Sequence, residues 1–164
     1  MKFLSIKEYF YKLNTIGFIL LLLPLGVFIF LYYRSIDWQP WIVDQQSAFM
    51  LIGTFIIIFL VNLTIVHWVW KAKMNKLKTN IELTRKMDGY FVLTMLKMSV
   101  YCGCSLLMAI GFFLTQDSMF TGGFILFAIG MVFQWPSPAL FCKHLDLRGS
   151  EREMVLQNTD MPKK

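Results

Sequence analysis

The sequence predicts an all-α fold, a bundle of four transmembrane helices with short interfacial helices on the cytoplasmic side. Two observations lead to this prediction. Of the 164 residues, 57% are hydrophobic and 16% are charged, whereas a typical soluble domain has about 45–50% and about 25%. The apolar residues also gather in four stretches, each close to the roughly 20 residues that span a bilayer as a helix. These stretches cover residues 15–33, 49–70, 90–114 and 119–135.

The segments outside these stretches leave little room for a second domain. Each is shorter than the roughly 50 residues of the smallest usual domains. We therefore expect residues 1–164 to form a single integral membrane domain, with residues 136–164 as a cytoplasmic tail.

The first stretch follows a basic segment, as in a secretory signal peptide. It continues past the roughly 7–15 apolar residues of such signals, so we expect a retained span. Ahead of it, Ser5 and Glu8 have the spacing of a capping box, which closes the first turn of a helix. Because apolar residues follow on one face, residues 5–13 are expected to form a short interfacial helix. The same spacing recurs twice in the polar segments: Thr79 with Glu82, and Ser150 with Glu153.

Aromatic residues mark the inner boundary of the second and third stretches. The second stretch ends at Trp70 and the third begins at Tyr90, and such side chains favour the level of the headgroups. Only Thr115–Ser118 separates the third stretch from the fourth. The last two spans are therefore expected to form an antiparallel helical hairpin.

The basic residues predict the orientation. Of the 16 Lys and Arg residues, all but Arg34 and Lys97 lie in the N-terminal segment, in the connection 71–89 or in the tail. Loops rich in Lys and Arg stay in the cytoplasm, so we expect both termini inside, as in a bacterial inner membrane. Such residues bind anionic lipid headgroups at about 1 kcal/mol each. Membrane lipids therefore account for the charge, and we expect no nucleic acid as a partner.

Lys97 is a basic residue within a predicted span, where a lysine at the centre costs roughly 2.5–3.5 kcal/mol. It lies seven residues after Tyr90, hence about 10 Å inside the boundary. Its ammonium could reach back toward the headgroups. Alternatively it faces other helices, because it shares one helix face with Thr94, Tyr101 and Ser105.

The second span brings further polar residues to this level. Asn62 lies eight residues before Trp70, at a depth similar to that of Lys97, and His67 lies nearer the surface. Interhelical hydrogen bonds among such residues hold bundles together or line a functional site. We therefore predict one polar intramembrane cluster: Asn62, His67, Thr94, Lys97, Tyr101 and Ser105.

Small residues predict where the third and fourth spans pack, since they allow helix backbones to approach closely. The third span offers Ser99 and Gly103, and the fourth offers Gly122, Gly123 and Gly130. We expect the two spans to meet along these positions.

Several function classes are disfavoured. The ten acidic residues all lie outside the predicted spans, whereas proton-driven exporters use an intramembrane carboxylate. Cys102 and Cys104 fall on different faces of a helix, without the histidine or acid that would complete a metal site. We expect no catalytic residue, no metal and no cofactor.

The leading hypothesis is therefore a non-enzymatic membrane subunit or scaffold. Its helices would pack with copies of the chain or with other membrane subunits, and its basic face would dock lipid or a partner. One alternative is an oligomeric channel or carrier lined by Thr94, Lys97, Tyr101 and Asn62, in which the lysine favours anions. Another is a membrane enzyme that uses His67, Lys97 or Tyr101 on a lipid-soluble substrate.

Overall fold

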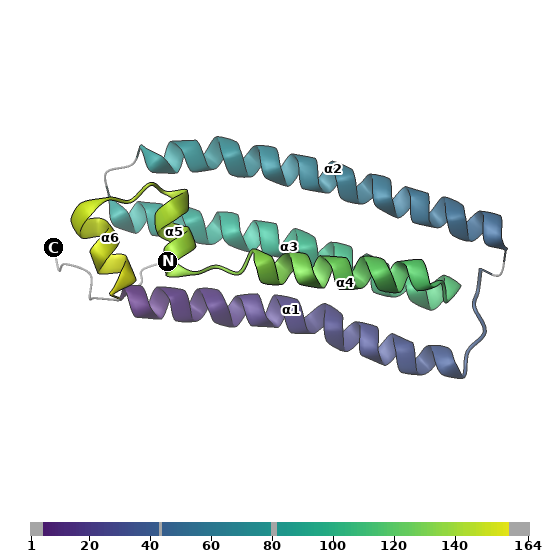
Figure 1. The fold of residues 1–164 in the computed structure, drawn as a ribbon. Coiled ribbons are helices and arrows are strands. Elements are labelled where there is room, and N and C mark those ends of the chain that lie inside the picture. The colour runs from purple at the N-terminus through teal and green to yellow at the C-terminus, as the bar shows by residue number, and fades with distance from the viewer. Residues whose placement is uncertain (1–4, 43, 80–81, 158–164) are drawn as a thin grey trace.

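A computed structural model describes residues 5–42, 44–79 and 82–157, which form helices and no strands. The all-α prediction is confirmed for these residues. The four long helices lie side by side, and the first and last described residues, at the start of α1 and the end of α6, lie at the same end of the bundle (Figure 1). The helices are α1 Ile6–Ile36, α2 Gln45–Lys78, α3 Leu83–Thr115, α4 Ser118–Phe133, α5 Pro138–His144 and α6 Gly149–Leu156.

Three helices, α1, α2 and α3, are long and apolar enough to cross a membrane. The 16 residues of α4 extend about 24 Å, which is less than the hydrocarbon thickness of about 30 Å. Together with α5, which follows a bend of 80°, α4 makes a fourth candidate. By length and composition, the described residues thus contain three candidate spans, or four if the bent pair counts as one.

The first three helices extend beyond their predicted apolar stretches at the end of the bundle that holds the termini. Residues 5–13 were expected to form a separate interfacial helix, and this expectation is wrong. They are the first turns of α1, with the Ser5 hydroxyl accepting from the backbone N–H of Glu8 at 3.1 Å. The apolar face of these turns was predicted correctly, but it packs against protein. Its members Ile6, Tyr9, Phe10 and Leu13 are buried in a cluster with residues of α3 and α5.

Only one of the three predicted capping boxes has its capping residue at a helix start. Ser5 caps α1 as predicted. Thr79 instead lies at the end of α2, where its hydroxyl donates to a carbonyl of the last turn, and Glu82 precedes α3 without a side-chain cap. Ser150 lies inside the first turn of α6, which begins at Gly149. The box at Thr79 fails because α2 continues well past its apolar stretch.

At the far end of the bundle, the two connections are held together. The N–H of Ile42 donates to the carbonyl of Leu114 at 3.1 Å, and the Gln116 amide donates to the carbonyl of Ser35 at 3.1 Å. Asp44 caps α2 by accepting from the hydroxyl and the N–H of Ser47. These two bonds hold the pKa of the Asp44 carboxyl below its usual value. The expected tight turn between the third and fourth spans is confirmed, since α3 ends at Thr115 and α4 starts at Ser118.

Helix α3 is the common packing partner of the other long helices. It packs against α1, α2 and α4 along its length, and Figure 1 shows it between α1 and α2. In the most apolar 18-residue stretch of α3, 44% of the residues are buried, compared with 11% in the corresponding stretches of α1 and α2. The outer helices meet each other through aromatic rings. Phe28 stacks on Phe124 at 4.3 Å between centroids, and Phe59 meets Phe127 at the same distance.

The interior divides into two apolar clusters. One fills the far half of the bundle and is built from α3 and α4, with Phe28, Phe55 and Phe59 packed against it. The other lies at the end that holds the termini and includes residues of α1, α2, α3, α5 and α6. The tail thus folds back onto the bundle and contributes Phe141, Leu145 and Val155 to this second cluster.

The small residues predicted to join α3 to α4 fall into two groups in the structure. Gly123 faces Met108, whose sulfur would lie 3.0 Å from an added Cβ, and Gly130 faces the ring of Tyr101. Ser99, Gly103 and Gly122, by contrast, are exposed on the outside of the bundle, and a Cβ on either glycine would meet nothing within 4 Å. These three residues do not join α3 to α4, because they lie on faces turned away from the contact.

Among the described glycines at the contact of α3 with α4, Gly111 leaves the least room for a side chain, and it was not predicted. A Cβ at this position would overlap the ring of Phe120. That ring cannot move aside easily, since it is buried to 1% exposure and packs edge-on against Phe55.

The glycines make a testable pair. Gly111→Ala is expected to lower the free energy of unfolding by about 1–3 kcal/mol, because the new methyl overpacks against Phe120. Gly103→Ala is the matched control, and it should be neutral or stabilising because alanine favours the helix. Unfolding of both variants in detergent micelles measures the difference. Equal stabilities would contradict this packing.

Candidate functional site

The end of the bundle that holds the termini is closed by the tail. Two ion pairs attach it: Lys86 Nζ lies 3.0 Å from Glu151 Oε2, and Lys78 Nζ lies 3.1 Å from Asp146 Oδ2. The Lys86 side chain is only 10% exposed, so the first pair is largely shielded from solvent. These pairs link α6 to α3, and the segment between α5 and α6 to α2.

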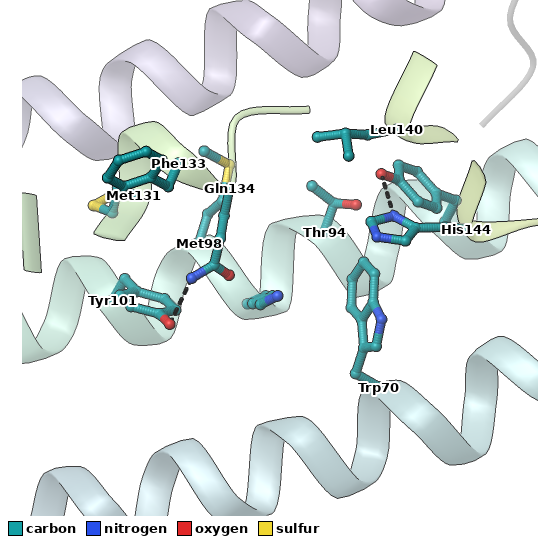
Figure 2. Close-up of a pocket in the computed structure, with 11 residues that line it drawn as sticks. Trp70, Thr94, Met98, Tyr101, Met131, Phe133, Gln134, Leu140 and His144 are labelled. Carbon is teal, nitrogen blue, oxygen red and sulfur yellow. Dashed lines mark hydrogen bonds between the residues drawn. The ribbon is translucent and has the colours of Figure 1, made fainter. Parts of the chain in front are cut away.

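A cavity of about 130 Å³ lies beneath the end of α4. It exists because α4 ends at Phe133, well before the level at which α3 begins, and because α5 turns away at 80°. Figure 2 shows Gln134 and Tyr101 on one side of this space, with Thr94, Trp70 and His144 on the other. We call it the Lys97 cavity. Its polar lining comes from Tyr90, Thr94, Lys97, Tyr101, Gln134 and His144.

Lys97 is the cation of this cavity. Its ammonium lies over the ring of Trp70, 4.9 Å from the centroid, where the ring face attracts a positive charge. No carboxylate lines the cavity, and none of the ion pairs found among the described residues involves Lys97. A positive charge therefore lines this space without an acidic partner among the lining residues.

Two hydrogen-bonded pairs flank the lysine. The Gln134 amide donates to the Tyr101 hydroxyl at 2.6 Å, and the Tyr90 hydroxyl lies 3.2 Å from Nδ1 of His144. The oxygen of the Gln134 amide is buried without a hydrogen-bond partner. Because a tyrosine hydroxyl can donate as well as accept, a flip of this amide would keep the first bond and turn its NH₂ group toward the cavity. One half of the amide thus has no hydrogen-bond partner among the described residues.

The structure brings together half of the predicted polar cluster. Thr94, Lys97 and Tyr101 line the same cavity, as their spacing on one helix face predicted. His67 lines a neighbouring groove between α2 and α3, together with Lys97 and Tyr101.

The structure places the other two predicted members, Asn62 and Ser105, outside this cavity. The Asn62 amide donates to the carbonyl of Ile58 on its own helix at 2.8 Å, which provides a partner without a second helix. Ser105 is buried beside an apolar groove between α1 and α4. Three turns of helix separate Ser105 from Thr94, so one end of the shared face lies at the cavity and the other in the far cluster.

The ends of three apolar stretches lie near Lys97. An added Cβ on Gly17 would lie 3.3 Å from Met98, which places the first residues of the α1 apolar stretch beside Lys97. Trp135, at the end of the fourth stretch, packs on Phe18 with 4.6 Å between ring centroids. Trp70, the last residue of the second stretch, lies under the ammonium itself. Lys97 therefore lies level with one end of the apolar stretches of α1, α2 and α4.

Sequence reasoning missed the cavity role of Trp70, Tyr90, Gln134 and His144. The two aromatic residues were assigned to the membrane boundary and were given no part in the polar cluster. The short fourth stretch was a signal that its helix ends near Lys97. Nothing in the sequence indicated the position of His144, because this residue reaches the cavity only through the bend before α5.

Comparison of the chain with protein-family models, with curated proteins and with solved structures finds no match. The functional argument therefore depends on the geometry of the site.

The two lysines of this region are expected to differ in their effect on stability. Lys97 pairs with no carboxylate in the ion pairs found among the described residues. Lys97→Met should therefore lower the free energy of unfolding by at most about 1 kcal/mol, the strength of a cation–π contact. Lys86→Met leaves Glu151 unpaired and should cost about 1–3 kcal/mol. Chemical unfolding of both variants in detergent measures these values. If Lys97→Met were the more destabilising change, Lys97 would have a structural role.

Proposed function

We propose that this chain is a four-span integral membrane protein with both termini in the cytoplasm, as in a bacterial inner membrane. Large apolar side chains cover the outer surfaces of the long helices, as lipid contact requires. Examples on α1, α2 and α4, all more than half exposed, are Leu22, Ile57, Leu60, Leu126 and Val132. Within this arrangement, α4 crosses the membrane together with the bend that precedes α5.

The charges support this orientation. Basic residues gather on the last turns of α2, the first turn of α3 and the tail, all at the end that holds the termini (Figure 1). Lys71, Lys73, Lys76, Arg85, Lys143, Arg148 and Arg152 are members of this group. Anionic headgroups on the cytoplasmic leaflet would attract such a surface.

We further propose that the protein is a non-enzymatic membrane component, a subunit or scaffold, that holds an acidic lipid-soluble molecule in the Lys97 cavity. The observation that carries this proposal is the ammonium of Lys97, which lines a cavity at the edge of the apolar region with no carboxylate in the lining. An acidic group would supply the missing counter-ion. Assembly with other copies or subunits is part of the proposal, because exposed Ser99, Gly103 and Gly122 allow close approach of a partner helix.

The interior favours a binding protein over a pore within one chain. Beyond Tyr101 the space between the helices is filled by aromatic rings: Phe127 lies against Phe59, and Phe120 against Phe55. The polar lining of the Lys97 cavity therefore ends at a closed apolar cluster.

The binding proposal predicts a specific effect of Lys97. Phosphatidate should bind the purified protein in detergent, and Lys97→Met should weaken this binding at least about tenfold, because a charge-assisted hydrogen bond contributes about 1.5–3 kcal/mol. Native mass spectrometry measures the bound lipid. Lys76→Met is the matched control, since Lys76 is an exposed lysine at the same end of the bundle.

Phosphatidylcholine tests the requirement for an acid in the same experiment and should bind more weakly, with no dependence on Lys97. If Lys97→Met and Lys76→Met bound phosphatidate equally, the cavity would not be its site, and the proposed function would be rejected.

The orientation has its own test. In a chain whose native cysteines are replaced, Asp44→Cys and Asp117→Cys should react with a membrane-impermeant thiol reagent added to intact cells, because both lie at the far end of the bundle. Lys76→Cys should react only after the cells are opened. Labelling of position 76 in intact cells would contradict the orientation.

A further inference from the structure

We propose that the ligand of the Lys97 cavity is a single-chain amphiphile, whose small acidic head lies at Lys97 and whose apolar chain lies in the groove between α2 and α3. This inference rests on the proposed function and adds the chemical class of the ligand and its path. We call this second space the α2–α3 groove. Its walls include Leu60, Leu63, Thr64, Val66 and His67.

The cavity and the groove are continuous. Trp70, Lys97 and Tyr101 line both of them. The cavity has a volume of about 130 Å³ and carries most of the polar groups, whereas the groove has about 540 Å³. A small polar space thus opens into a larger one at the position of the Lys97 ammonium. This arrangement suits an amphiphile whose polar head lies in the cavity and whose apolar chain lies in the groove.

The groove runs along the apolar part of α2. Trp70 and Leu60, at its two ends, lie ten positions apart on α2, or roughly 15 Å of helix. Leu63 and Val66 provide apolar walls, and the Thr64 hydroxyl already donates to the carbonyl of Leu60 at 2.7 Å. An apolar chain could therefore lie here without leaving that hydroxyl unpaired.

The groove opens to the side of the bundle. Leu60 is 55% exposed and Trp68 is 73% exposed, so two of its walls reach the outer surface that we assign to lipid. The opening follows from the packing of α2, which contacts α3 closely but meets α4 mainly through its rings. A membrane amphiphile could enter from the bilayer without crossing water.

Charge and size select the head group. Lys97 is the only Lys, Arg, Asp or Glu among the residues that line the cavity and the groove. A phosphate monoester or a carboxylate would pair with it, and the hydroxyls and the Gln134 amide offer further hydrogen bonds. A choline head would place a second cation beside the ammonium and would need more room. The site therefore fits a small acidic head on one apolar chain.

The test compares two tryptophan substitutions by native mass spectrometry with oleoyl lysophosphatidate as the probe. Leu63→Trp fills the groove and should weaken binding about tenfold. The control Leu126→Trp, at an exposed position on α4 outside both spaces, should leave binding within about twofold. A tenfold loss of affinity relative to the wild-type protein corresponds to about 1.4 kcal/mol of binding free energy. Glycerol 3-phosphate, which has the head without the chain, should bind far more weakly than the lipid.

Binding to Leu63→Trp at the wild-type level, with dependence on Lys97 retained, would overturn the groove but leave the proposed function standing. If Lys97→Met bound the probe as tightly as the wild-type protein does, both the groove and the proposed function would be overturned. Should Leu63→Trp fail to fold, lysophosphatidate with a photoreactive group on its chain decides with the unmodified protein. Crosslinks within residues 60–67 support the groove, and crosslinks on α1 or α4 overturn it.

Discussion

The packing of every long helix against α3 is the constraint on which the rest of the structure depends. Because α1, α2 and α4 each contact α3 closely, they meet one another only through side chains long enough to bridge the gaps, chiefly Phe28, Phe55 and Phe59. Where α4 is present, its rings fill the spaces beside α3. Where α4 has ended, those spaces stay open.

The Lys97 cavity is a consequence of this arrangement. The helix α4 stops at Phe133 while α3 continues, and the tail closes the gap from below through α5 and α6. Lys97 lies on α3 at the level of this gap, beside the ends of the apolar stretches of its neighbours. In the proposed membrane arrangement, a lysine at this level would need less compensation than one at the centre of a bilayer, and its charge would be available to the proposed ligand.

Properties that depend on one helix could be predicted from the sequence, and those that depend on where helices end could not. Hydropathy located the four long helices, and helical spacing placed Thr94, Lys97 and Tyr101 on one face. Asn62 was assigned to this cluster by depth alone, although its amide bonds to its own helix. Gln134 and His144 reach the cavity through the end of α4 and the bend before α5. Hydropathy does not encode the angle of that bend.

A structure determined in lipid nanodiscs that contain phosphatidate would test the central claim most directly. The account predicts that the Lys97 ammonium lies at the inner edge of the hydrocarbon region, beside Trp70 and Gln134, with the density of an acidic head in contact with it. A Lys97 side chain that points into lipid, with the space beneath α4 filled by protein, would contradict the account.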